Sequence, residues 1–147
     1  MTILHGFLTG DHKECDEAFV DAESAVASGD WHKANAAWRS FEQHLLRHFS
    51  MEEEVLFPAI EQRTGMTQGP TEVMRCDHEQ MRALLARLDD CLTASDARGF
   101  LGLAETMMVL VQQHNMKEEQ VLYPMADELL EDPQAVLAAM RARHQAE

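Results

Sequence analysis

The 147-residue chain has the length of one compact domain, and its 46% hydrophobic and 26% charged residues exclude an intrinsically disordered chain. With 12 basic and 26 acidic residues it carries a formal net charge of −14, which excludes nucleic acids and anionic membrane surfaces as expected partners. The sequence has no apolar run long enough to cross a bilayer and no signal-peptide pattern, and its three cysteines include no C-x-x-C pair. We therefore expect a cytoplasmic protein, with the oligomeric state left open.

The helical spacing of apolar residues predicts five helices, over about 9–28, 31–63, 70–95, 97–130 and, more briefly, 133–144. Asp30 and Asp96 are expected to cap the second and fourth helices. Pro58 and Pro124 lie inside these same two helices and should kink or end them nearby. No strand pattern is found. The expected fold is all-α: an up-down-up-down four-helix bundle with a short C-terminal helix, forming a single domain over residues 1–147.

The sequence contains an internal repeat. Residues 48–61 read HFSMEEEVLFPAIE and residues 114–127 read HNMKEEQVLYPMAD, with His, two Glu, Val, Leu and Pro in the same register. The offset of 66 positions also relates Asp11-His12 to Asp77-His78. The chain therefore looks like two copies of one helical hairpin, covering about 9–64 and 70–130.

The turns of these hairpins set the heights of the histidines. Residues at equal distances from a turn lie level with each other in an antiparallel pair of helices. The midpoint of His12 and His48 is position 30, and that of His78 and His114 is position 96, which are the two predicted breaks. Each half should therefore bring two imidazoles to one level of the bundle.

Each of these helices adds a carboxylate, because Glu52 follows His48 by four residues and Glu118 follows His114 by four. Such pairs project from one helix face, and bundle cores commonly hold metal ions in this way. Mixed imidazole and carboxylate ligation suits iron, manganese or zinc. We expect two ions bridged by the carboxylates, with open positions for a small molecule. The candidate ligands are His12, His48, Glu52, His78, His114 and Glu118.

Other residues leave alternatives open. His44, one turn before His48, is a weaker candidate that could be an additional ligand or could lie outside the ligand set. Glu53 and Glu54 are expected on a solvated face, and Glu119 at the surface or behind the ligands. The structural alternative is a bundle that serves only as an interaction module, in which the histidines are packing residues.

These motifs, from Asp11-His12 to Leu-Tyr-Pro at 122–124, resemble the hemerythrin family, and specifically its bacterial hemerythrin-like HHE cation-binding domains. The resemblance implies a non-haem di-iron site, with the four repeat histidines as iron ligands and the two glutamates as bridges. Oxygen-carrying hemerythrins have a further histidine one turn from the His78 position, where this chain has Met74 and Arg82. Their last carboxylate is an Asp one position beyond Glu118.

The expected function is that of a di-iron protein that reacts with oxygen or a related small oxidant, in sensing, delivery or detoxification. The alternative is an enzyme that turns over peroxide or nitric oxide, or an iron donor for iron-sulfur cluster repair. The expected partner in each case is a small molecule, and no residue is assigned a catalytic role beyond metal binding.

Overall fold

The computed structural model describes residues 3–146, which are helical apart from short connections and include no strand. The expected all-α class is confirmed. The elements are α1 (Ile3–Ala27), α2 (Trp31–Met51), the π-helical segment η1 (Glu52–Leu56), α3 (Phe57–Thr64), α4 (Pro70–Thr93), α5 (Ala97–Lys117), the π-helical segment η2 (Glu118–Leu122), α6 (Tyr123–Leu129) and α7 (Pro133–Ala146). No helix within these residues is both long and apolar enough to span a membrane.

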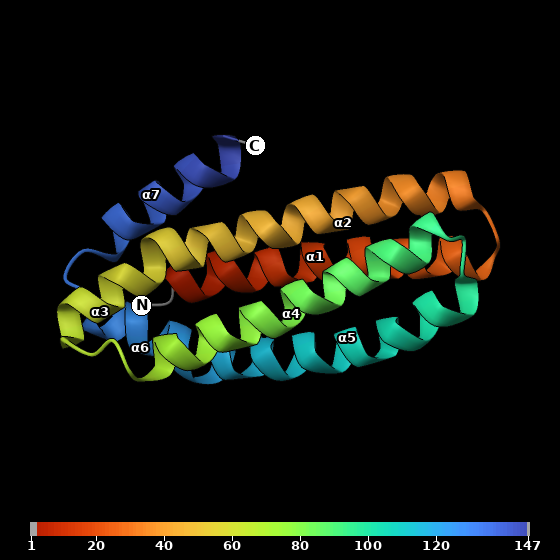
Figure 1. Ribbon diagram of the computed structural model, residues 1–147. Coiled ribbons are helices and arrows are strands. Elements are labelled where there is room, and N and C mark those ends of the chain that lie inside the picture. The colour runs from red at the N-terminus through yellow and green to blue at the C-terminus, as the bar shows by residue number, and fades with distance from the viewer. Residues whose placement is uncertain (1–2, 147) are drawn as a thin grey trace.

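The long helices α1, α2, α4 and α5 lie side by side in the bundle, as Figure 1 shows. α1 packs along α2 and α4 packs along α5, while α7 lies outside against α2 and α1. The caps predicted for the second and fourth helices are confirmed. The Asp30 carboxylate accepts a hydrogen bond from the Lys33 amide, and the Asp96 carboxylate accepts one from the Gly99 amide. These caps fix both hairpin turns and with them the heights of the histidines.

The first helix begins at Ile3, not near residue 9 as the local pattern predicts. Leu4 and Leu8 are fully buried, so the additional turns contribute to the core. The Asp127 side chain on α6 accepts hydrogen bonds from the amides of Leu4 and His5, at 3.0 and 3.1 Å. The helix start is thus stabilised from a distant part of the chain, which local sequence patterns do not reveal.

The expected disturbances at Pro58 and Pro124 take the form of π-helical turns directly before them. The Phe57 amide bonds to the Glu52 carbonyl five residues back, and the Tyr123 amide bonds to the Glu118 carbonyl in the same way. The helices continue through these turns, since each proline occupies the first turn of α3 or α6, where an amide donor is not required. The π-helical segments occur at the same offset of 66 positions as the sequence repeat.

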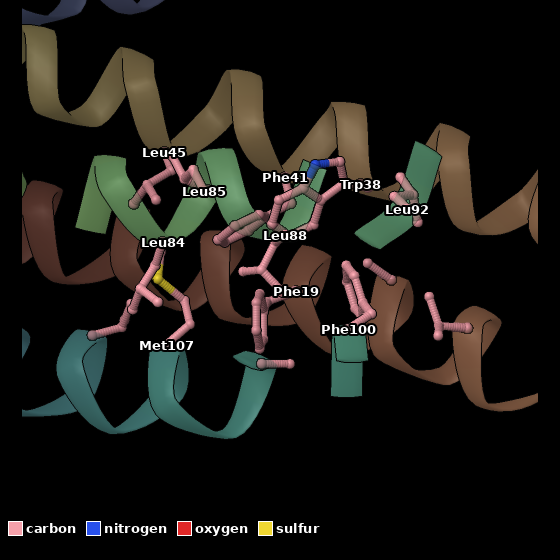
Figure 2. Close-up of a cluster of buried hydrophobic side chains, with 14 of the residues drawn as sticks. Phe19, Trp38, Phe41, Leu45, Leu84, Leu85, Leu88, Leu92, Phe100 and Met107 are labelled. Carbon is pink, nitrogen blue, oxygen red and sulfur yellow. The ribbon is translucent and has the colours of Figure 1, made fainter. Parts of the chain in front are cut away.

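The apolar interior forms two separate clusters. The turn-end core lies near the Asp30 and Asp96 turns, and Figure 2 shows its side chains from α1, α2, α4 and α5 meeting around Phe19, Trp38, Phe41, Leu88 and Phe100. The proline-end core joins the start of α1 to α3, α6 and α7, and includes Leu4, Leu8, Phe57, Tyr123 and Met140. The predicted ligands lie between the two cores.

Candidate metal centre

Six buried polar side chains meet between the two cores, and they are the six that the repeat predicts: His12 on α1, His48 on α2, Glu52 in η1, His78 on α4, His114 on α5 and Glu118 in η2. None is more than 5% exposed. They form two groups of four, each with two histidines and both glutamates, and within each group the ligand atoms lie within 4.8 Å of one another.

The glutamates connect the two groups, because each directs one carboxylate oxygen to either side. Glu52 places Oε2 3.4 Å from His48 Nε2 and Oε1 3.0 Å from His78 Nε2. Glu118 places Oε1 3.1 Å from His12 Nε2 and Oε2 3.1 Å from His114 Nε2. This arrangement allows two cations to share both carboxylates.

The hydrogen bonding of the second group, which is formed by Glu52, His78, His114 and Glu118, indicates whether a cation fits there. Glu52 Oε1, His78 Nε2, His114 Nε2 and Glu118 Oε2 are all buried, and although each oxygen faces a nitrogen at 3.0 or 3.1 Å, none forms a hydrogen bond of acceptable geometry within the described residues. Leaving so many buried polar atoms unsatisfied is costly, whereas a shared cation would satisfy all of them. Their nitrogen and oxygen chemistry suits a borderline divalent ion such as iron, manganese or zinc.

In each of the four histidines of the centre, Nε2 faces the glutamates and Nδ1 forms a hydrogen bond with a further carboxylate. The Nδ1 partners are Glu119 for His12 (2.7 Å), Asp11 for His48 (2.7 Å), Glu53 for His78 (2.6 Å) and Asp77 for His114 (3.0 Å). A carboxylate can only accept, so each Nδ1 carries the proton and each Nε2 is available to a metal. The arrangement follows the repeat, since Asp11 corresponds to Asp77 and Glu53 to Glu119.

The expectation that Glu53 belongs to a solvated face is therefore wrong. Besides His78, it binds the Arg82 guanidinium at 2.8 and 2.9 Å. Glu54 is exposed as expected and pairs with Arg143. The difference arises because Glu53 points across to α4, and such contacts between helices depend on the packing angle rather than on the helical pattern of one segment.

The side chains perturb one another's pKa values strongly. Burial by itself disfavours the imidazolium, but the neighbouring carboxylates outweigh it, so Glu52 and Asp11 raise the pKa of His48 well above its usual range, and Glu118 raises that of His114 to about 9. Burial likewise opposes ionisation of Glu52, yet His48 and His78 hold its pKa well below the usual value. The metal-free centre is thus a network of ion pairs, and cations must compete with protons for it.

His44 lies outside both groups. Its Nε2 is 2.9 Å from Asp11 Oδ1, while the other oxygen of Asp11 binds His48. His44 therefore contacts the centre through Asp11, and the repeat offers no counterpart because position 110 is a leucine.

Tyr123 is the functional candidate that the sequence pattern missed. It is fully buried, and its hydroxyl lies 2.5 Å from Glu52 Oε2 and 2.8 Å from Glu118 Oε1. On a regular α-helix, positions 118 and 123 would be about 140° apart around the axis. The i→i+5 hydrogen bond of η2 brings them to the same face. The sequence signal that could have indicated this π-helical turn is the proline that directly follows Phe57 and Tyr123 in the two copies of the repeat.

A small, mainly apolar cavity adjoins the histidines on the side of the turn-end core. Its volume is about 10 Å³, room for one water-sized molecule. It is lined by His12, His48, His114, Cys15, Asp16, Leu45, Phe49, Met81, Val111 and Asn115. A ligand that occupies it would have to be very small.

Comparisons with known proteins agree with the geometry. The family model for the Hemerythrin HHE cation binding domain matches residues 4–126, most of the chain and all six buried groups. No curated protein and no solved structure matches significantly. The matched region runs from the start of α1 into α6 and so includes both copies of the hairpin. The chain therefore belongs to the hemerythrin family of HHE cation-binding domains.

Proposed function

We propose that this chain is a non-haem di-iron protein that reacts with oxygen or a related small oxidant, in sensing, delivery or detoxification. The observation that carries the proposal is that Glu52 and Glu118 each divide their two oxygens between two histidine pairs. Such sharing suits two cations side by side. His12, His48, His78 and His114 would supply the imidazole ligands.

Iron bound there would supply electrons for reduction of the small oxidant. The protein side chains would orient the ligands and restrict access to the centre. The Nδ1 carboxylates fix each imidazole with Nε2 toward the centre. Leu45, Phe49, Met81 and Val111 line the adjoining cavity, where they limit the entry of water and of larger molecules.

The proposal also covers the organisation of the whole chain. We assign the four long helices to an up-down-up-down order in a single domain over 1–147, which is supported by the pairing of α1 with α2 and of α4 with α5. A reducing compartment such as the cytoplasm suits the three free cysteines.

Elemental analysis of the purified protein tests the metal. We expect about two iron ions per chain after ferrous reconstitution, and a clear loss in His48→Ala and Glu118→Gln, because each removes a donor from a buried site. Glu128→Gln is the matched control, since Glu128 is exposed near the same end of the bundle. Equal iron content in Glu118→Gln and the wild-type chain would contradict the proposal.

Turnover of peroxide or nitric oxide is the second candidate function. The cavity favours it, because its size suits one small neutral molecule beside three of the histidines. If the chain is such an enzyme, the steady-state rate at which the iron-loaded chain consumes peroxide or nitric oxide should exceed the rate with an equal concentration of free iron. A single stoichiometric reaction with oxygen, without turnover, would favour the binding role instead.

A further inference from the structure

The Tyr123 hydroxyl lies close to four candidate ligand atoms. Its oxygen is 2.5 Å from Glu52 Oε2, 2.8 Å from Glu118 Oε1, 3.1 Å from His12 Nε2 and 3.4 Å from His48 Nε2. Among these four atoms, His12 Nε2 is 3.1 Å from both His48 Nε2 and Glu118 Oε1, and His48 Nε2 is 3.4 Å from Glu52 Oε2. One oxygen is therefore close to every donor of the first group.

These separations are those of neighbouring ligands on one ion. Two donors bound at about 2.1 Å with a right angle between their bonds lie about 3.0 Å apart. The distances from the tyrosine oxygen to the four donors, 2.5 to 3.4 Å, lie around this value, as do the three separations among the donors given above. A tyrosine hydroxyl has one O–H to donate, so a hydrogen bond to one glutamate leaves the oxygen of the other in close contact, whereas a cation shared with both would account for the two contacts.

The second group has no such oxygen. Phe57 occupies the repeat position of Tyr123, and its ring stacks on His78 with centroids 5.6 Å apart and a 28° interplanar angle. The Tyr123 ring stacks on His12 at 5.6 Å and 29°. The two aromatic rings are thus placed alike, and the hydroxyl is the difference between them.

We propose that Tyr123 is the fifth protein ligand of the cation held by His12 and His48, so that the two cations are chemically different. This inference rests on the proposed di-iron function and deepens it. On metal binding the phenol O–H bond breaks, an oxygen–metal bond forms, and the proton is released to the buffer, with no change in oxidation state. The cation beside His78 then has one protein donor fewer.

The test uses the vibrational and electronic spectrum of the iron-loaded, oxidised chain. Phenolate bound to ferric iron gives visible charge-transfer absorption and resonance-enhanced tyrosinate ring vibrations. Tyr123 is the only tyrosine in the sequence, so any such signal belongs to it, and ring-deuterated tyrosine should shift the vibrations. A second readout needs no iron redox chemistry: zinc binding to the metal-free chain should produce the ultraviolet difference spectrum of tyrosinate.

Two variants complete the design. Tyr123→Phe should keep the fold and abolish the tyrosinate vibrations. Adding Phe57→Tyr to it should restore them, because the rings are placed alike and the phenolate is then supplied to the other cation. A wild-type chain that binds iron but shows no tyrosinate vibrations would overturn this inference and leave the di-iron proposal standing. A chain that binds no metal would overturn both.

Discussion

Four carboxylates outside the ligand set decide how the histidines can act. Asp11, Glu53, Asp77 and Glu119 each accept a hydrogen bond from one Nδ1 and leave the opposite nitrogen for the metal. They also add negative charge close to where cations would bind. Asp77 is the simplest to test, because it is half-buried and, among the residues that the structure describes, pairs with His114 and Lys117 alone.

Asp77→Asn should weaken metal binding without unfolding the chain. Removing the charge makes the His114 imidazole a poorer ligand, and partners of this kind typically change metal affinity by about 10- to 100-fold. Competition with a chromophoric chelator measures the affinity. Asp90→Asn on the exposed face of the same helix is the control and should bind metal like the wild-type chain.

The residues whose proximity could be predicted from the sequence are those that repeat on one helix or across one hairpin turn. His48 and Glu52 are related by helical periodicity, and His12 and His48 by equal distance from the Asp30 turn. Tyr123 and Glu53 could not be found in this way. Tyr123 depends on a π-helical turn, and Glu53 depends on a contact between helices that are not consecutive in the chain.

At the scale of the element, α1 depends on a distant cap. Its early start, which the local pattern did not predict, is held by the Asp127 carboxylate on α6. By contrast, the caps Asp30 and Asp96 act within their own segments, and the local pattern did predict those. The helix starts that the sequence predicts correctly are thus those capped by residues close by in the sequence.

Asp127→Ala should destabilise the folded chain by about 1 kcal/mol, the usual effect of removing a side-chain cap. Urea unfolding of the metal-free protein measures the change. Glu128→Ala removes an adjacent exposed carboxylate that makes no such bond and should have little effect. Equal destabilisation by both variants would mean that the cap contributes nothing.

A carboxylate pair between α2 and α4 should make stability depend on pH. Burial, a hydrogen bond with Asp89 and the charge of Asp89 raise the pKa of Glu42 to about 7. Because this lies above the value in the unfolded chain, the contribution of Glu42 is fully present below the unfolded pKa of 4.5 and is lost as the pH rises through about 7.

Glu42→Gln should therefore reduce the loss of stability between about pH 5 and about pH 8, by roughly 0.5 kcal/mol or less, since the pair is partly exposed and screened by water. Urea unfolding at the two pH values gives the difference. Glu17→Gln, at an exposed position with no such partner in the described residues, should leave the dependence as in the wild-type chain. An unchanged slope in Glu42→Gln would contradict the assignment.

At the scale of the whole molecule, part of the negative charge of this acidic chain is gathered at the candidate metal centre and not only on the surface. Six carboxylates of the centre lie against four imidazoles, so bound cations would offset part of this charge. Ligand binding to the folded state alone stabilises it by about 2.7 kcal/mol at a concentration of 100 Kd. Removing the metal with a chelator should therefore lower the melting temperature, and an unchanged melting temperature would argue against a buried metal.

The two separate apolar cores give the centre a role in cooperativity. The layer of histidines and carboxylates lies between the turn-end core and the proline-end core, and α1, α2 and α4 contribute side chains to both cores. In the metal-free chain we expect the smaller proline-end core to open first, so that amides of α3 and α6 exchange with deuterium before those in the middle of α2 and α4. Cations that bind residues from both halves would cross-link the layer and merge the two events. Metal occupancy would then decide whether the chain unfolds in two steps or as a single unit.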